Sequence, residues 1–241
     1  MRKLAVLVMV ALVVPAMAGT LTADPGRPIF AGSHGAMNRG TVVYDNTVNG
    51  PLFGFSQNPN ALIADDLTLD FTGAPGNILE DLAFVVYNGS SSTALMDSVD
   101  VDISVFNFDV PSGTYVYAAT LTFTGLTPGL APGYFTTYSA TGLSTNGIAL
   151  ADDILLGIQM YNTQPGVKPG TIGYDPPVVG ASADIFFLDN TVATPPGTSN
   201  GWYWFGGPPY VANFYWGVGV VPEPTSLLLL ALGGLTLARR R

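Results

Sequence analysis

The clearest pattern along the chain is an alternation of apolar and polar residues in VDVDISVF, at residues 99–106. Val99, Val101, Ile103 and Val105 alternate there with two aspartates and a serine. Successive side chains of a strand point to opposite faces, so this segment predicts a strand with one buried and one wetted face. Similar short apolar runs predict nine further strands, at residues 41–44, 67–71, 82–87, 115–123, 134–138, 154–161, 185–188, 202–205 and 214–220.

Turn-forming residues separate these runs, and no segment between the two chain ends has a capped helical period. Clusters such as NGSSS and TPPGTSNG interrupt the chain, and its 241 residues include 29 glycines and 19 prolines. Many short strands with turns between them are typical of two packed antiparallel sheets. We therefore predict an all-β fold, an antiparallel β-sandwich of jelly-roll type over residues 41–221, with short hydrophobic helices outside it at both termini.

The first eighteen residues have the three parts of a secretory signal peptide. Two basic residues come first, an apolar run follows at residues 4–14, and the small-residue pattern AMA ends the segment. This pattern predicts that signal peptidase cleaves between Ala18 and Gly19 during export. The next segment, residues 19–40, is rich in glycine and proline, and we expect it to be flexible.

The C-terminus has a short motif, an apolar run and a charged stop. The motif Pro222-Glu223-Pro224 precedes fourteen residues without charge at 225–238, and Arg239, Arg240 and Arg241 end the chain. As a helix this run is about 21 Å long, against a hydrocarbon core of about 30 Å. We expect a short transmembrane helix that holds the protein at the membrane transiently, with the arginines on the cytoplasmic side.

This order of parts at the extreme C-terminus resembles the PEP-CTERM sorting signal of bacteria. The resemblance implies that a membrane-embedded exosortase recognises residues 222–241 and that the protein reaches the cell envelope, cell surface or extracellular space, in strains that make exopolysaccharide. The segments TVVYDNT, IADDLTLDF and DLAFVVYNG also resemble uncharacterised planctomycete-type PEP-CTERM proteins. That second similarity implies a β-sandwich without a catalytic motif.

Charge narrows the classes of partner. Residues 19–238 hold all seventeen acidic residues and only three basic ones, Arg27, Arg39 and Lys168, which gives a formal charge of −14. Binding to nucleic acid needs clustered Lys and Arg, so we expect no nucleic-acid partner. The chain has no cysteine, which excludes disulfides, zinc–thiolate sites and thiol nucleophiles. A negative surface suits solubility, cation binding or a place in an anionic matrix.

Residues able to carry catalysis are sparse. His34 is the one histidine and no G-x-S-x-G motif accompanies it, so a Ser-His-Asp triad and a histidine metal centre both lack parts. A glycosidase needs two carboxylates across a cleft. Glu80 and Glu223 are the only glutamates, Glu223 belongs to the C-terminal motif, and the pattern singles out no aspartate pair. We therefore expect no enzyme.

Two Asp-Asp steps, Asp65-Asp66 and Asp152-Asp153, each stand directly before an apolar strand pattern. Adjacent ionised carboxylates repel each other, so such a pair either lies in water or is neutralised. Ca²⁺ binds carboxylate and backbone oxygens of loops. These four aspartates are therefore candidate calcium ligands, and the alternative is that they are solvated strand ends. The sequence indicates no other cofactor.

All three tryptophans, Trp202, Trp204 and Trp216, fall within fifteen residues. In a strand Trp202 and Trp204 share one face, while Tyr203 and Phe205 share the other. An exposed tryptophan pair can stack on sugar rings, whereas large aromatic side chains more often pack into a core. Trp202 and Trp204 are therefore candidate carbohydrate-stacking residues, with core packing as the alternative.

Together these features predict an exported protein of the cell surface or extracellular matrix, associated with exopolysaccharide, with a structural or adhesive role. The alternatives are a carbohydrate-binding module and a polysaccharide-active enzyme.

Overall fold

The computed structural model describes residues 20–23, 27–28, 40–48, 51–56, 59–91, 93–126, 128–161, 163–174, 176–189, 201–205 and 213–222. The expected terminal helices, the cleavage point between Ala18 and Gly19, and residues 223–241 lie outside these ranges. No helix within the described part is long and apolar enough to cross a membrane.

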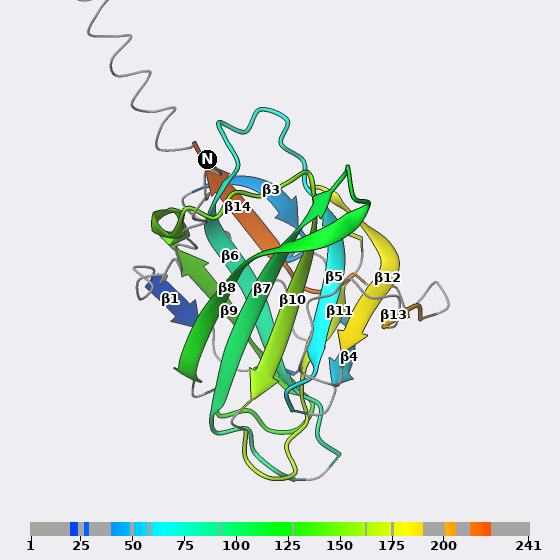
Figure 1. Ribbon diagram of the computed structural model, residues 1–241. Helices are drawn as coiled ribbons and strands as arrows, with labels where there is room; N and C mark the ends of the chain where they lie inside the picture. Colours follow the sequence, from blue (N-terminus) through cyan, green and yellow to red (C-terminus); the bar gives the residue numbers. More distant parts are fainter. Residues whose placement is uncertain are drawn as a thin grey trace, which may run out of the picture.

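Two antiparallel sheets pack face to face, as the alternating pattern predicts (Figure 1). Eight strands form the framework: β4 (Pro51–Ser56), β5 (Leu62–Thr68), β6 (Ile78–Asn88), β7 (Val99–Asp109), β8 (Thr114–Leu126), β9 (Tyr134–Thr141), β10 (Asp153–Tyr161) and β11 (Pro169–Tyr174). Their pairing is nested, because β4 pairs with β11, β5 with β10, β6 with β9 and β7 with β8. This nesting within two sheets is the jelly-roll topology, so the predicted fold is confirmed.

Six further strands extend the two sheets. In the eight-stranded sheet, β1 (Thr20–Ala23) and β2 (Arg27–Pro28) pair with β9, while β14 (Gly217–Val221) lies between β6 and β3 (Thr41–Asp45). In the six-stranded sheet, β12 (Ala181–Asp189) pairs with β5 and carries β13 (Trp202–Tyr203). A short 3₁₀ helix, η1 (Leu143–Asn146), follows β9. The segment expected to be flexible thus contributes two edge strands, β1 and β2.

A central core fills the space between the sheets. The four apolar residues that alternate along β7 all belong to it, as the sequence pattern predicts. Phe84 of β6 lies at its middle, with its ring centroid 5.3 Å from that of Tyr138 and 5.2 Å from that of Phe123. Trp216, just before β14, is also buried in this core.

Each sheet also has an apolar cluster on its outer face. On the six-stranded sheet, the outer cluster consists of Leu62, Ala64, Phe106, Leu155 and Phe187. A register shift between Val105 and Phe106 bends the β7–β8 hairpin, since a bulge increases the local twist of a strand pair. The hairpin therefore curls over this face, and Tyr115 of β8 lies 6.1 Å from Trp202 of β13, ring centroid to ring centroid.

The sandwich has two ends: the tail end, where the chain leaves for its C-terminal tail, and the pocket end, where the β10–β11 loop lines a pocket. At the tail end, β14 finishes with Val221 paired to Ile78, the first residue of β6. At the pocket end, Asn88, the last residue of β6, pairs with Pro169 after the β10–β11 loop. The eleven residues of β6 span about 36 Å between these ends. Figure 1 shows the β14 arrow pointing to the end opposite the β10 arrow.

Candidate functional site

Asp65 and Asp66 lie inside a strand, which corrects the expectation that they precede one. The strand predicted at 67–71 instead begins at Leu62, and the two aspartates are its fourth and fifth residues. Because neighbours in a strand point to opposite faces, the two carboxylates diverge. Asp65 faces the central core, and Asp66 faces the outer cluster of the six-stranded sheet.

Asp65 is fully buried and serves as a hydrogen-bond acceptor between three segments. Its Oδ1 accepts the Ser182 hydroxyl at 3.0 Å and its Oδ2 accepts the Phe214 backbone N–H at 2.8 Å. Burial, followed by the charge of Asp66, holds the pKa of the Asp65 carboxyl well above its usual range. A protonated or ionised Asp65 therefore joins β5 to β12 and to the chain that enters β14.

Asp66 lies opposite a bulge in β12, where the pairing jumps from Ser182 to Phe186. Its Oδ1 is buried and has no hydrogen-bond partner within the described structure. Burial raises the pKa of the Asp66 carboxyl to about 7, and the nearby charge of Asp153 adds to the rise. Asp66 is thus an ionisable group in a half-buried position on the outer face.

Asp153 is the first residue of β10, which begins one residue earlier than the predicted strand at 154–161, and its Oδ1 accepts the Thr68 hydroxyl at 2.6 Å. Asp152 is exposed, and its carbonyl accepts the Leu69 N–H at 2.7 Å. The structure therefore brings Asp66 and Asp153 together on the outer face and turns Asp65 away from both. Within the described ranges, no three Asp, Glu or His side chains gather as metal ligands would. The calcium site stays a prediction.

Two other acids, Glu80 and Asp81, are buried although the sequence pattern did not single them out as site residues. Glu80 accepts the Ser144 N–H at 3.2 Å and so holds η1 against β6. Asp81 is almost fully buried, and its Oδ2 accepts the Gly40 N–H at 2.6 Å. Both lie near the start of β6, where they fix the chain at the tail end. Their sequence signal was the pair of acids in an otherwise apolar strand, ILEDLAFVVYN.

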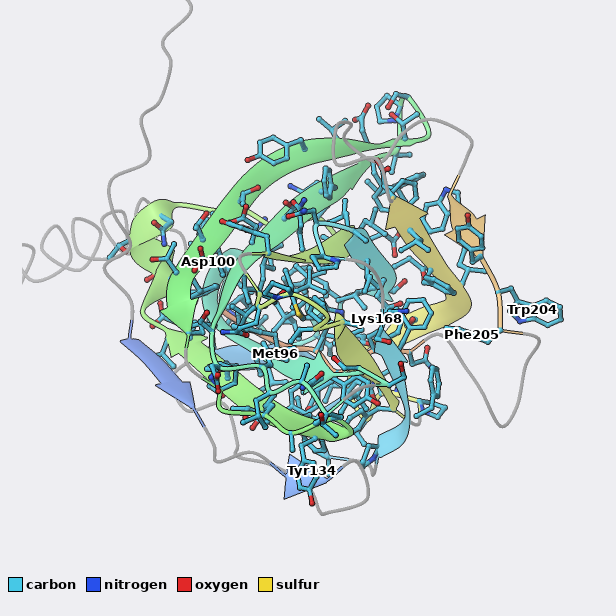
Figure 2. The ribbon with its side chains drawn as sticks, turned by 90° about the horizontal axis from the view of Figure 1, so that it is seen from below. Met96, Asp100, Tyr134, Lys168, Trp204 and Phe205 are labelled. Atoms are coloured by element: carbon cyan, nitrogen blue, oxygen red, sulfur yellow. The ribbon has the colours of Figure 1, made fainter. Side chains whose placement is uncertain are left out.

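An exposed aromatic patch lies at the free edge of the six-stranded sheet. It consists of Trp202, Tyr203 and Trp204, which are 39%, 49% and 64% exposed. The Trp202 ring packs edge-on against Phe187 with centroids 5.7 Å apart, which fixes one end of the patch. Figure 2 shows Trp204 projecting from the side of the sandwich, next to Phe205. The candidate stacking residues are therefore exposed, and Trp216 alone of the three tryptophans is in the core.

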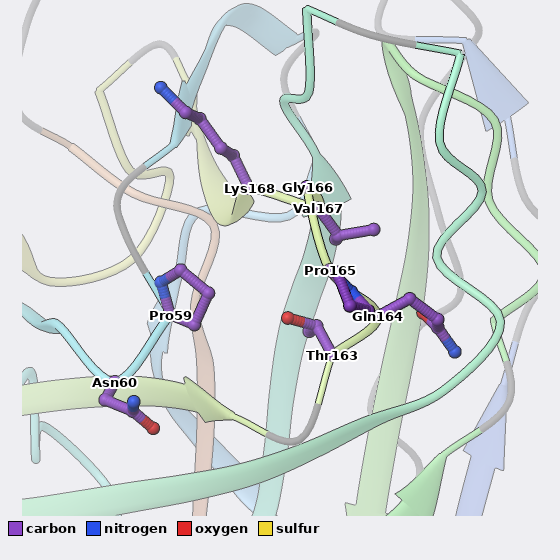
Figure 3. Close-up of a pocket in the computed structure, with 8 residues that line it drawn as sticks. All are labelled: Pro59, Asn60, Thr163, Gln164, Pro165, Gly166, Val167 and Lys168. Atoms are coloured by element: carbon purple, nitrogen blue, oxygen red, sulfur yellow. The ribbon is translucent and has the colours of Figure 1, made fainter.

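A pocket of about 490 Å³ opens at the pocket end (Figure 3). The turn at Pro59 and Asn60 forms one wall, and the β10–β11 loop from Thr163 to Lys168 forms the other. Gln164 anchors this loop, because its side chain bonds the Asp97 N–H at 3.1 Å and the Ser98 hydroxyl at 3.1 Å. The sequence pattern did not predict this pocket, and the one sequence feature that marks it is a lone lysine beside a Pro-Gly turn, in QPGVKPG.

Comparison with known proteins identifies one part of the chain. A family model described as the PEP-CTERM protein-sorting motif matches residues 220–241. No curated protein and no solved structure matches the chain. The similarity of the body to planctomycete-type proteins stays a prediction.

The match begins inside the fold. Val220 is a buried residue of β14 that pairs with Thr41 and Leu79, and the described chain ends two residues later at Pro222. The motif that exosortase processes therefore continues directly from the last strand of the sandwich. The chain is an exported protein with a PEP-CTERM sorting motif, which directs it to the cell envelope or cell surface.

Proposed function

We propose that the jelly-roll domain is a non-catalytic structural or adhesive component of the cell surface or its extracellular matrix. The observation that carries this proposal is the continuity between β14 and the sorting motif. Because the motif starts within a strand held on both sides, the whole sandwich is the cargo of export. Cleavage of the signal peptide at Ala18 and removal of the arginine cluster belong to the same proposal.

This continuity also orients the domain. Only residues 222–224 separate β14 from the apolar run, and three extended residues span about 10 Å. While the tail is held in the membrane, the tail end therefore faces the bilayer. The pocket end lies a further strand length away and faces outward.

The aromatic patch supports a carbohydrate contact for this surface role. Flat aromatic rings with apolar faces and polar edges suit exposed contacts with partly apolar ligands such as sugar rings. Trp202, Tyr203 and Trp204 present such rings on an edge that faces solvent. We propose that the patch binds matrix polysaccharide, and that Trp204, the most exposed of the three, contributes most.

A binding experiment tests this assignment. Exopolysaccharide from the host is immobilised, and retention of the exported protein is compared with that of Trp204→Ala and Tyr134→Ala. Tyr134 is a matched control, because it is 40% exposed but belongs to β9 of the other sheet. We expect Trp204→Ala to lose at least about tenfold in affinity, as for removal of one stacked ring, and Tyr134→Ala to bind as the wild type does. Equal binding by all three proteins contradicts the carbohydrate contact.

The location is tested separately by cell fractionation. The wild-type protein should accumulate at the cell surface or in the matrix, and a variant without residues 222–241 should not be retained there. A wild-type protein found only in the cytoplasm contradicts export itself.

Glu80 supports the non-catalytic part of the proposal, since its carboxylate is buried and holds η1. Turnover of a polysaccharide that one Asp→Asn substitution abolishes would instead favour the enzyme.

A further inference from the structure

Among the strands that the structure describes, β8 is the longest at a sheet edge. It is the terminal strand of the six-stranded sheet and has thirteen residues, about 44 Å in length. The other edge strands within the described ranges are shorter, since β13 has two residues, β3 five and β4 six. A strand at a sheet edge presents a row of unpaired backbone N–H and C=O groups.

The outward side of β8 is open. Within the described structure, residues 114–126 make backbone hydrogen bonds to β7 alone among the strands, through the ladder and through the Gly125 N–H, which donates to the Asp100 carboxylate at 2.6 Å. Val116 and Tyr117 are 51% and 52% exposed on this edge. An open edge of this kind is a template to which another extended chain can add by backbone hydrogen bonds.

The composition of β8 lacks the usual protection against such addition. Its sequence, TYVYAATLTFTGL, has no charged residue and no proline, although residues 19–238 carry a formal charge of −14. Edge strands that must stay single commonly carry lysine, proline or bulges. β8 has only the bulges, near Ala118 and Gly125, and these bracket a regular segment at residues 119–123.

We propose that β8 pairs antiparallel with β8 of a second copy of this chain, with the two-fold axis between residues 120 and 123, inside this regular segment. A two-fold axis makes one patch sufficient for both subunits, because each strand offers the other the same uncharged edge. Thr120 and Thr122 of one copy then lie opposite or diagonal to the same threonines of the other copy on the outer face, where threonine pairs stabilise antiparallel strands. The product is a continuous sheet of twelve strands.

The charges near β8 do not prevent a second copy of this acidic chain from pairing at this edge. The nearest acids are Asp100 and Asp102 on β7, one strand inside the edge. After pairing, three strand spacings, about 14 Å, separate each from its copy. That distance exceeds the Debye length of about 8 Å at physiological salt. Two copies can therefore approach through β8 without close charge repulsion.

The direction of β8 sets when pairing can occur, a consequence that rests on the proposed function. β8 starts at the tail end and runs to the pocket end. Val116, near its start, pairs with Asn107 of β7, and Asn107 pairs with Ile154, near the start of β10 at the tail end. Antiparallel pairing therefore puts the two tail ends at opposite ends of the dimer. Two copies held in one membrane cannot pair in this way, so release of the tail permits assembly.

Sedimentation of the exported, released protein tests the pairing. We expect the wild type to be a dimer at micromolar concentration. Thr122→Lys with Thr124→Lys places charges on the edge and should raise the dimer dissociation constant at least about tenfold. Thr93→Lys with Thr145→Lys adds the same charge at exposed positions away from β8 and should leave it unchanged. A monomeric wild type, or equal dimerisation of both double variants, overturns the proposal.

Disulfide cross-linking tests the register. Because the chain has no cysteine of its own, every disulfide must come from an introduced cysteine. Single cysteines are placed at Thr120, Thr122 and Thr124, and the proteins are oxidised alone and in pairwise mixtures. Antiparallel pairing about one axis predicts disulfides only between positions whose residue numbers add to one constant. Positions off that register are more than 7 Å apart at Cα and cannot bridge. Cross-linking in every mixture, or in none, overturns the proposal.

Discussion

The two faces of β5 place neighbouring residues in opposite chemical environments. Asp65 points into the central core, where a hydroxyl and a backbone N–H bind its carboxyl oxygens. Asp66 points to the outer face, where one carboxyl oxygen has no partner among the described residues and Asp153 is close by. The inner carboxyl is therefore part of the framework, and the outer one is free to titrate.

This contrast shows what a strand does to a sequence motif. Two adjacent acids read as one chelating pair only if both side chains reach the same space. The period of two separates them, so Asp66 has more to do with Asp153, 87 positions away, than with Asp65. The same contrast holds for the apolar side chains of β5, because those on one face belong to the central core and those on the other face belong to the outer cluster.

The largest difference between the two faces should come from removing one ring on each. Phe84→Ala removes a ring that packs against Phe123 and Tyr138 and so opens a cavity in the central core. We expect this variant to lower the free energy of unfolding by about 4 kcal/mol. Phe106→Ala, under the curled hairpin, should cost about 2 kcal/mol, because Tyr115 and Tyr117 can close over the space. Urea unfolding of the exported protein measures both. Equal losses would mean that the outer cluster is as rigidly packed as the core.

The next largest effect should come from Asp65. Asp65→Ala leaves the Phe214 N–H and the Ser182 hydroxyl without their buried acceptor, which we expect to cost about 3 kcal/mol. Asp65→Asn keeps one acceptor oxygen and should cost about half as much. Urea midpoints of the two variants check this order. If both variants were as stable as the wild type, Asp65 would not join β5 to β12 and β14.

The sequence predicted the strands whose pattern alternates and missed those that glycine shapes. β4 and β11 contain PLFGFS and PGTIGY, which lack a clear period. A Cβ at Gly54 would lie 2.4 Å from the Tyr87 ring, and one at Gly173 would lie 2.4 Å from the Phe53 ring. These glycines make room for rings from other strands of the same sheet, and only the tertiary structure reveals that need.

Site prediction was limited for a related reason. The exposed tryptophans and the sorting motif were found because each is continuous in the sequence. The separation of Asp65 from Asp66 was missed because the two acids interrupt the apolar pattern and hid the first half of β5. The pocket was missed because its walls come from segments about 100 residues apart, which only the pairing of β5 with β10 brings together.

A smaller effect, of opposite sign, should follow from Asp66. Its pKa of about 7 in the folded chain lies above the usual 3.8, so the folded state binds more protons between pH 4 and 7 and loses stability as pH rises through that window. Asp66→Asn should therefore match the wild type near pH 4 and exceed it by about 2 kcal/mol at pH 8. Thermal or urea unfolding across this range measures the difference.

Asp70→Asn is the control for the sign of that effect. The Thr72 side chain and backbone N–H lower the pKa of the exposed Asp70 carboxyl, so Asp70 stabilises the folded state above pH 4 and loses that contribution as pH falls. Asp70→Asn should thus be slightly less stable than the wild type at neutral pH and equal to it in acid. If the Asp66→Asn difference showed the same sign as this control, Asp66 would be stabilised, not strained, by its surroundings.

The smallest expected effect is that of calcium. Within the described ranges the outer face offers Asp66, Asp153 and the Thr68 hydroxyl, whereas Ca²⁺ takes six to eight oxygen ligands. Asp65 cannot add to this set, because it faces the core and both its oxygens accept hydrogen bonds. We therefore expect millimolar CaCl₂ at pH 8 to raise the free energy of unfolding by no more than about 0.5 kcal/mol over NaCl of the same ionic strength.

The thermal midpoint of the exported protein, measured at pH 8 in EDTA, in CaCl₂ and in matched NaCl, tests for calcium binding. Asp66 is ionised at this pH, because its pKa is about 7. Asp66→Asn and Asp153→Asn should abolish whatever calcium-specific gain exists, and Asp152→Asn should leave it intact, because only the first two carboxylates share the outer face. A rise of several degrees with calcium alone, removed by Asp66→Asn, would contradict the contrast between the two faces of β5. A bound cation would then hold Asp66 on the outer face as firmly as hydrogen bonds hold Asp65 on the inner face.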